Sequence, residues 1–534
     1  MKKYKKYMIF ALLFLPMASC NILNLTPEDY YAVGTFWKSE AQVNGFITGL
    51  HTDMRSNYTR FYLLGEVRGG TMVSGNSIVN TSPNYASPQK NNAFTANSTG
   101  YTSWAGIYGS LMQVNLAITE LETGCTFLTT QERNKFLGTA YGIRALWYFM
   151  LYKTYGGVPL VDKVKILDGK IYAEKLYQPR AKASEILAFI KSDIAKSEAA
   201  YGDNTQYETT HSLWSKYATL MLKADVYLWA AKVSVGDQAA GATADLNIAK
   251  TALDPIVNGT QYKLMPDFIN VFRIKNAANT ETIFALRFMD KEATNFGSSF
   301  VSADNVFVNQ VYLRDHTLMT PEKEVQMINA KSTGLLREAY KYSFFAYFDP
   351  EDLRRDATFV DVYTSSDGGK TFNNGGVVTL KLMGEINSEA NRVYNTDWQV
   401  YRLAEAYLMM AEIENKLGND PSPWINKVRE RAYGANYQKH VHTNQGFAAN
   451  ELAILKERDC EFVAEGKRWF DIVRMQDAAQ QPLAFSAVVN FTEAYPVQPA
   501  NLPVIGTNEK FKLLWPVDIT TLNNDPLLEQ TPGY

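Results

Sequence analysis

Residues 399–433, QVYRLAEAYLMMAEIENKLGNDPSPWINKVRERAY, contain two amphipathic segments separated by a short break. The apolar residues of the first segment recur at spacings that share one face of a helix: Val400, Leu403, Tyr407, Met410 and Leu417. Gly418 is a typical helix C-cap, and the two prolines that follow restart the chain. The pattern predicts a helix hairpin over 399–417 and 424–433.

Other segments carry the same periodicity. Residues 132–155, 181–201 and 211–233 each place apolar residues every three or four positions. A last helical block is expected from about 448 to 477. Paired amphipathic helices with small residues at their crossings suggest a tetratricopeptide-like array, although no clean repeat of about 34 residues is present.

The helical period is lost in two regions. Residues 74–103 are rich in Ser, Asn, Thr and Pro and predict a long surface loop. Residues 260–395 are dominated by Asn, Gly, Thr and aromatic residues, which predicts functional loops or a small subdomain laid on the helical frame. Two glycine pairs in this region mark expected hairpin turns: Gly368-Gly369 and Gly375-Gly376. The expected fold class is mainly α, with helix pairs and a loop-rich, partly β region.

The first twenty residues have the pattern of an export signal. Four lysines precede the apolar run Met8–Met17, which is shorter than the ~20 residues of a membrane-spanning helix. Met17-Ala18-Ser19-Cys20 resembles a bacterial lipobox, in which the cysteine is acylated and becomes the mature N-terminus. We therefore expect a lipid anchor on Cys20, which would hold the protein at a membrane. The alternative is an ordinary secretory signal with an unrelated cysteine.

The composition is that of a globular protein, with 46% hydrophobic and 20% charged residues among 534. The formal net charge is only -2, and no Lys/Arg-rich run occurs outside the N-terminus, which argues against nucleic acid as a partner. Aromatic residues make up 13%, and the excess of Tyr over Phe hints at rings with one wet edge. Cys125 and Cys460 make no disulfide framework and are expected to be free and buried.

Motifs of common enzymes and metal sites are missing or incomplete. Gly369-Lys370-Thr371 resembles the end of a phosphate loop, but Thr364 stands where its leading glycine is required. His440 and His442 would share one side of a strand and could hold a metal together, yet no third ligand is defined. Two polar loop histidines are the favoured interpretation, and neither a metal nor a cofactor is expected.

Two acidic groups resemble catalytic carboxylates without forming a clear pair. Glu405, Glu412 and Glu414 lie on one expected surface helix, so a solvated or ion-paired face is favoured over a hydrolase site. A dense alternation of charge follows on the last helical block and predicts a structural salt-bridge network: Glu457, Arg458, Glu461, Glu465, Arg468, Asp471 and Arg474.

Several of these segments resemble the SusD/RagB family. YRLAEAYLMMAE (401–412) looks like the family's RxAExxLMxAEA helix, and INKVRERA (425–432) like its LNxVRxRA helix. ERDCEFVAEGKRWFD (457–471) is similar to the ERxxEFxxEGxRxxDL segment. Further matches are RALWYF (144–149), YGGVPL (155–160) and the ending WPVD…NDPLLEQTPGY (515–534), in which Asp518 and Thr531 depart from the usual glutamate and asparagine.

The resemblance implies a SusD-like fold with four tetratricopeptide-like helix pairs and a loop-rich ligand face. It implies a lipoprotein of a Bacteroidetes-type outer membrane, facing the cell exterior. Such a protein captures oligosaccharide, or alternatively peptide, as a non-enzymatic lid on a SusC-like TonB-dependent transporter. Residues 1–19 would be the signal peptide and 20–534 one SusD-like domain. Within it we expect a helical frame over about 30–255 and 396–480, a ligand-side region over about 260–395, and a tail over 481–534.

Ligand contacts are expected from loops. Tyr85, Tyr101 and Trp104 cluster around 74–103, although Trp104 fits the core equally well; Tyr312 and Arg314 lie in the long irregular region. Trp147, Tyr217 and Tyr407 lie on helix stripes and are expected in the core. Two other functions stay open: a secreted hydrolase, and an intracellular tetratricopeptide scaffold, which the export signal argues against.

Overall fold

The computed structural model describes residues 36–74, 87–99, 103–164, 173–204, 211–241, 243–275, 278–301, 306–328, 334–492 and 502–534. Three residues singled out from the sequence, Cys20, Tyr85 and Tyr101, lie outside these ranges.

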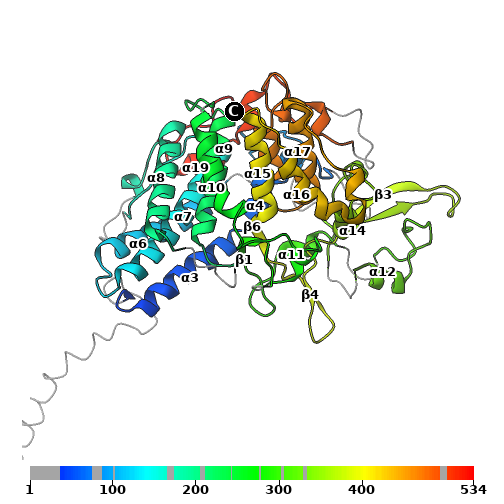
Figure 1. Cartoon of the computed structure of the whole chain (residues 1–534), viewed down its shortest axis with the longest axis horizontal. Helices are drawn as coiled ribbons and strands as arrows, with labels where there is room; N and C mark the ends of the chain where they lie inside the picture. The colour runs from blue at the N-terminus through cyan, green and yellow to red at the C-terminus, as the bar shows by residue number, and fades with distance from the viewer. Residues whose placement is uncertain are drawn as a thin grey trace, which may run out of the picture.

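A succession of paired helices forms the larger part of the molecule (Figure 1). Its first members pack one on the next: α3 (Glu40–Ser56), α6 (Ala105–Thr123), α7 (Thr130–Tyr155), α8 (Ala183–Tyr201), α9 (Lys216–Lys232) and α10 (Thr243–Val257). The array continues through α15 (Leu403–Lys416), which packs on α10 and pairs with α16 (Ser422–Tyr433) and α17 (Phe447–Glu461). The helix pairing predicted from the sequence is confirmed.

Local signals explain the limits and the close packing of α7. A capping box between Thr129 and Glu132 begins the helix, and Gly156, with φ +75°, ends it. Gly142 lets a neighbouring ring approach the helix, because a Cβ there would lie 2.1 Å from Trp214 Nε1. Small residues at the crossings therefore allow large aromatic side chains to fill the space between helices.

Three predicted helices have different limits from those expected. The helix expected over 211–233 begins only at Lys216. The chain at 398–402 is not helical but forms β6 (Trp398–Arg402), which pairs antiparallel with β1 (Thr282–Leu286). The block expected over 448–477 divides into α17 and α18 (Arg468–Arg474). The break arises because Ala464 and Gly466 have positive φ, and a Cβ on Gly466 would lie 2.3 Å from the Phe61 carbonyl oxygen.

The irregular region carries short elements around a small core of its own. Its strands are β2 (Phe359–Thr364) with β3 (Asn373–Thr379), and β4 (Glu385–Ile386) with β5 (Arg392–Val393). Its helices are α11 (Asn270–Arg273), α12 (Pro321–Ile328), α13 (Tyr342–Phe345) and α14 (Leu353–Thr358). Val301, Phe307, Val311, Met319 and Val362 belong to a buried cluster separate from the main core. Both hairpins project from the body at the right and bottom of Figure 1.

The glycine pairs of this region differ in role. Gly368 and Gly369 have φ of +72° and +87° and make the β2–β3 turn, as expected. Gly375 instead lies inside β3, where the register passes from Val362↔Gly376 to Tyr363↔Asn374. Gly375 is therefore the extra residue of a β-bulge and not part of a turn.

The remaining short elements connect the parts: α4 (Thr59–Gly65), α5 (Ser87–Lys90), α19 (Ile519–Asn524) and the 3₁₀ helices Ala173–Lys175, Phe296–Ser299, Gly434–Lys439, Leu483–Phe485, Ala487–Val489 and Lys510–Leu513. Within the described ranges, no helix is both long and apolar enough to cross a membrane.

The main core contains the aromatic residues of the helix stripes. Trp147 and Tyr217 are buried, and Tyr407 is half-buried and stacks on Trp424. Cys125 and Cys460 are free and buried, as the sequence predicts.

The charged residues of 457–474 form a buried ion network. Glu461 pairs with Arg354 at 3.0 Å and with Arg402 at 2.6 Å, and it also contacts Arg431. Burial opposes ionisation of Glu461, but the surrounding guanidinium groups outweigh it and hold its pKa far below the usual value. Because Arg354 lies in the irregular region and Glu461 on α17, the network fixes the irregular region on the paired helices.

The three glutamates of α15 are buried rather than solvated. Glu412 lies 2.7 Å from Lys232 and 2.9 Å from Arg474, and Glu405 lies 2.9 Å from Lys467. Glu414 is also buried but pairs with the exposed Lys250 at 2.7 Å. The expected surface helix is therefore corrected, since all three carboxylates are buried and ion-paired. The ion-paired alternative is the one that the structure supports.

Candidate functional site

Five rings gather beside the β2–β3 hairpin and keep part of their surface exposed. We call them the ring cluster: Tyr312, His316, Tyr342, Tyr363 and Phe372. His316 stacks on Phe372 with ring centroids 3.9 Å apart, and Tyr312 meets Phe372 edge to face at 5.0 Å. Tyr342 and Tyr363 join through their hydroxyls at 3.2 Å.

Backbone pairing brings these rings together from distant parts of the sequence. Residues 311–319 fold into a small hairpin, in which Leu313 N donates to Thr317 O and Met319 N to Val311 O. Tyr312 and Tyr363 then exchange two backbone hydrogen bonds of 2.8 Å. The hairpin thus adds to the edge of β2, and side chains about 50 residues apart lie on one surface.

Arg314 holds the turn of this hairpin against β2. Its Nη2 lies 2.7 Å from Asp361 and 2.9 Å from Asp356. Hydrogen bonds to these two carboxylates raise the pKa of Arg314. Asp361 is buried and also accepts from the Tyr363 hydroxyl at 2.8 Å, so one carboxylate orients both the turn and a ring.

The backbone amides of the turn after β2 donate to side chains within the turn. Asp367 accepts hydrogen bonds from the Lys370 and Thr371 amides at 3.0 and 2.9 Å. Those bonds, together with the Thr371 hydroxyl, hold the pKa of Asp367 well below its usual range. The carboxylate therefore occupies the donors that a phosphate loop would offer, which agrees with the failed sequence motif.

The sequence-predicted residues have different surroundings. Tyr312 belongs to the ring cluster, and Arg314 lies beside it. Trp104 is only 5% exposed and packs edge to face against Tyr108 and Tyr155. It therefore lies in the core, which was one of the two positions that the sequence allowed. Ligand contact by Trp104, Tyr85 or Tyr101 stays a prediction.

The two loop histidines contact different groups. His440 Nε2 lies 2.8 Å from Glu351, whereas His442 is buried and its Nε2 lies 3.2 Å from Asn450 Oδ1. They therefore do not face a common position, and a metal held jointly by His440 and His442 does not fit the structure.

Sequence reasoning identified only Tyr312 of the ring cluster and not His316, Tyr342, Tyr363 or Phe372. Phe372 directly follows the Gly369-Lys370-Thr371 motif, and Tyr363 lies beside β-branched residues, so neither carries a local signal of a binding site. Both hairpins are rich in aromatic residues, and their pairing would have indicated a shared surface. That pairing joins segments far apart in the sequence, so local pattern does not reveal it.

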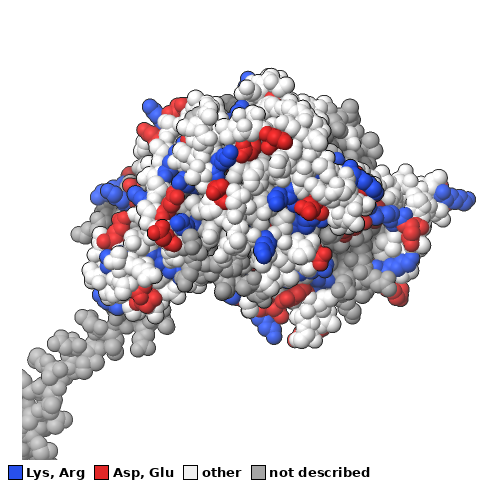
Figure 2. All heavy atoms as spheres, viewed as in Figure 1, with Lys and Arg blue, Asp and Glu red and all other residues white. Residues whose placement is uncertain are grey.

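Hollows elsewhere on the described surface offer other chemistry. An apolar hollow of about 790 Å³ lies between α3 and α6, lined by Phe36, Trp37, Phe46, Leu50 and Leu116. A smaller one of about 280 Å³ beside β4 is lined by Arg273, Lys275 and Arg392. The face shown in Figure 2 carries basic and acidic side chains in alternation, without a continuous field of one sign.

The chain matches two models of protein families that together cover nearly all of it. Residues 25–228 match the family described as starch-binding associating with outer membrane. Residues 227–534, more than half of the chain, match the SusD family.

Named relatives agree with these matches. The chain is 23% identical to SusD-like protein P38 of Formosa agariphila, with all of both chains covered. It is 29% identical to the starch-binding protein SusD of Bacteroides thetaiotaomicron, over 26% of this chain and 22% of that protein.

Solved structures share the fold over most of the chain. A SusD superfamily protein of Bacteroides fragilis is 34% identical with a TM-score of 0.84, covering 93% of this chain and 100% of that one. NanU of B. fragilis is 29% identical with a TM-score of 0.80, covering 95% and 100%. Surface glycan-binding protein A of Bacteroides fluxus, at 18% identity, a TM-score of 0.65 and coverage of 93% and 100%, shares the fold.

Proposed function

Because this chain belongs to the SusD family, we propose that it is a cell-surface lipoprotein that captures oligosaccharide without enzymatic activity. It hands the glycan to a SusC-like TonB-dependent transporter in the outer membrane, on which it acts as a lid. The match of its N-terminal part to a family of starch-binding, outer-membrane-associated proteins is the observation that carries the proposal.

The ring cluster has the chemistry that a sugar site needs. A pyranose ring presents C–H groups that pack on an aromatic face, and its hydroxyls require hydrogen-bonding partners. Tyr312 and His316 supply partly exposed rings. The exposed carboxylate of Asp356, which forms an ion pair with the neighbouring Arg314, supplies a hydrogen-bonding group. We place the glycan on this cluster, with Tyr312 as a stacking residue.

The buried carboxylates support a binding role rather than hydrolysis. Glycosidases need two carboxyl groups facing each other across an open cleft at about 5–9.5 Å. Glu405 and Glu412 are buried and ion-paired, so neither reaches such a cleft.

A binding screen with matched variants tests the ligand class and the site. The mature protein is titrated against a polysaccharide panel and against peptides, together with Tyr312→Ala and Phe372→Ala. Loss of one stacking ring should weaken glycan binding by about 1 kcal/mol, roughly fivefold. The half-buried Tyr177, which follows a 3₁₀ helix in another part of the chain, provides the control Tyr177→Ala. If the protein binds peptides and no glycan, the ligand is peptide and the glycan proposal is wrong. If both ring variants bind glycan as well as the wild type does, the ring cluster is not the binding site.

The partner is tested separately. A lid that closes a barrel needs a large matched surface, so we expect a stable complex that buries more than ~2,000 Å². The protein should co-purify with a SusC-like barrel from mildly solubilised outer membranes, and Tyr312→Ala should not disturb that complex. Purification of the protein alone under these conditions would contradict the lid role.

A further inference from the structure

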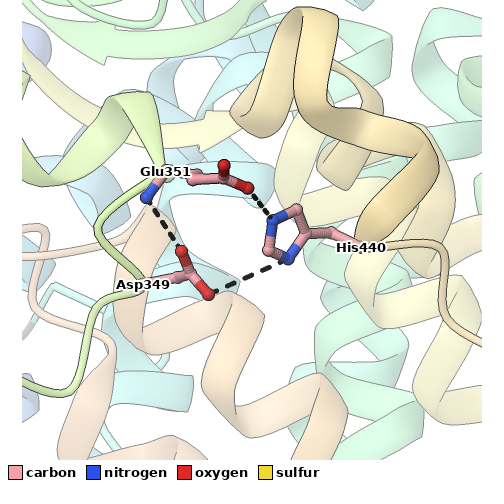
Figure 3. A group of neighbouring side chains, drawn as sticks. All are labelled: Asp349, Glu351 and His440. Atoms are coloured by element: carbon pink, nitrogen blue, oxygen red, sulfur yellow. Dashed lines mark hydrogen bonds and ion pairs between the residues drawn. The ribbon is translucent and has the colours of Figure 1, made fainter.

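A cluster of three potential metal ligands lies where the irregular region meets the helical frame. Asp349 and Glu351 come from the loop before α14, and His440 directly follows the 3₁₀ helix Gly434–Lys439 (Figure 3). The imidazole lies between the carboxylates, with Nε2 2.8 Å from Glu351 and Nδ1 3.9 Å from Asp349. One donor atom of each residue lies within 4.8 Å of the other two.

Contacts behind the donors fix their positions. The His440 ring stacks on Tyr433 at 3.9 Å, and its backbone carbonyl accepts a hydrogen bond from Arg429 Nη1 at 3.0 Å. Asp349 Oδ1 accepts from the backbone amide of Glu351 at 2.8 Å, which leaves Oδ2 directed toward the imidazole. Supporting hydrogen bonds of this kind hold the ligands of metal sites in the correct orientation.

Both segments are also tied to the same buried ion network. Arg429 Nε lies 2.7 Å from Glu457, and Arg354 lies 3.0 Å from the other oxygen of that carboxylate. Arg354 in turn binds Asp352, the residue after Glu351, at 2.7 Å. The two sides of the cluster are therefore attached to one rigid anchor, and their separation is set before any ion binds.

We propose that Asp349, Glu351 and His440 form a binding site for a divalent transition metal of the zinc class, a property beyond the proposed glycan capture. One imidazole nitrogen and two carboxylate oxygens suit Zn²⁺, which takes three protein ligands and a water in open sites. Bonds of about 2.0–2.2 Å in a tetrahedron put neighbouring donors ~3.4 Å apart. The contacts of 2.8 and 3.9 Å reach different imidazole nitrogens, and an ion binds only one of them. One donor atom of each residue lies within 4.8 Å of the others, so rotation of the half-exposed carboxylates toward one side of the ring brings the three donors to an ion.

Lys439 is the competing cation at this site. Its Nζ lies 2.8 Å from Glu351 and donates to Asn436 Oδ1 at 3.0 Å, but the side chain is 64% exposed and its ion pair lies at the surface. Such pairs contribute about 0–1 kcal/mol, so a divalent ion can displace the ammonium into solvent. The bound ion would link the ligand-side region to the helical frame. Ca²⁺ is disfavoured because it takes oxygen ligands and has no use for the imidazole.

Zinc titration of the untagged mature protein tests the site. We expect one Zn²⁺ per chain, weaker binding of Ca²⁺, and a rise in melting temperature on adding Zn²⁺. Glu351→Gln and His440→Gln should each weaken Zn²⁺ binding at least about tenfold. Lys439→Ala should bind Zn²⁺ at least as tightly as the wild type, because it removes the competing charge.

Matched controls separate this site from adventitious binding. Glu430→Gln changes an exposed carboxylate on α16, and His316→Gln changes an exposed histidine, so neither should alter the zinc affinity. Equal weakening by control and site variants, or zinc binding that survives both Glu351→Gln and His440→Gln, would overturn the proposal. Melting curves without metal show whether each variant is folded. Two site variants that fold but differ in affinity from the wild type by less than threefold would also refute it.

Discussion

Glu465 offers a sharp test of the buried ion network. Its Oε1 lies 2.6 Å from Lys381 Nζ and 2.8 Å from Arg402 Nη2, and all three side chains are at most 4% exposed. Glu465→Gln keeps the shape of the side chain and removes its charge. Arg402 and Lys381 then each lose one compensating anion while staying buried.

The remaining partners set the expected loss of stability. Breaking a buried ion pair costs about 3–5 kcal/mol when one charge is left uncompensated. Arg402 keeps Glu281 and Glu461, but Lys381 keeps no direct carboxylate partner, only the backbone carbonyl of Glu461 at 2.9 Å and the faces of Phe272 and Phe268. We therefore expect about 3 kcal/mol. An unfolding entropy of ~2.1 cal/mol/K per residue over about 500 residues gives ~1 kcal/mol/K, so the melting temperature should fall by ~3 °C.

The effect depends on pH in a defined direction. Burial opposes ionisation of Glu465, but the charges of Arg402 and Lys381 outweigh it and lower its pKa below the ordinary 4.5. A lowered folded-state pKa contributes stability above the unfolded-state value, and that contribution is lost as pH falls through the folded-state value. The difference between wild type and Glu465→Gln should therefore be complete at pH 7 and shrink only below pH 4.5.

Thermal melts and glycan titrations on the same preparations provide the measurement. Glu430→Gln serves as the control, since its carboxylate is exposed on α16. At 25 °C Glu465→Gln should bind glycan like the wild type. Unchanged melting combined with lost binding would refute the structural role, because it would place Glu465 at the ligand. An unchanged melting temperature with normal binding would refute the loss of stability expected from removing the Glu465 charge.

Two further predictions concern the anchor and a buried acid. Cys20→Ala protein should leave the membrane fraction, whereas wild-type protein should stay there after a salt wash; equal retention of both would exclude the lipid anchor. Glu66 is buried, which raises its pKa to about 7 although Tyr340 donates a hydrogen bond to it. A raised acid pKa means that the folded state binds more protons between pH 4.5 and 7, so stability falls with rising pH in that window. Glu66→Gln should remove this slope, worth roughly 3 kcal/mol in denaturant titrations at pH 5 and 8, and parallel curves would contradict it.

The helix pairs were predictable from the sequence because their stability rests on local periodicity. The apolar stripe of 400–417 and Gly418 predicted the helix and its end. Its first turn was misread, because Val400 and Leu403 suit a helix face and a buried strand equally. Only pairing with β1, more than 100 residues away, decides that 398–402 is β6.

The sequence predicted a salt-bridge network over 457–474 but not that its residues are buried. Alternating charge along a helix usually indicates a solvated face, and spacing alone does not reveal burial. Burial of Glu461 and Glu465 depends on Arg354, Lys381 and Arg402, which come from other segments. Ionic partners at such sequence separations follow from the fold and not from local pattern.

The candidate site shows the same limit. Tyr312 and Arg314 were identified because they lie in an aromatic stretch without helical period. Phe372 and Tyr363 join them only through the backbone pairing of two hairpins. Sequence reasoning therefore named one ring of the candidate cluster and its neighbouring arginine, while the full set of rings required the register.

Arg314 was predicted to contact ligand, and its surroundings suggest that it positions the ring cluster instead. Nε and Nη2 bond Asp361, and Nη1 and Nη2 bond Asp356, so most of its donors already have partners. Arg314→Lys keeps the charge but loses the forked contact with Asp361. A positioning role predicts that glycan binding weakens roughly fivefold, the factor that about 1 kcal/mol produces.

A second variant separates the two roles. Asp361→Asn leaves Arg314 in place and weakens its hold on the turn, and it also weakens the support of the Tyr363 hydroxyl. If Arg314 positions the rings, Asp361→Asn must reproduce the loss seen with Arg314→Lys. If Arg314 donates directly to the glycan, Asp361→Asn releases donors for the ligand, and binding should hold or improve while Arg314→Lys still fails. Normal binding by Asp361→Asn together with weak binding by Arg314→Lys would therefore refute the positioning role. Arg314 cannot position the rings through Asp361 if the charge of Asp361 is not needed for binding.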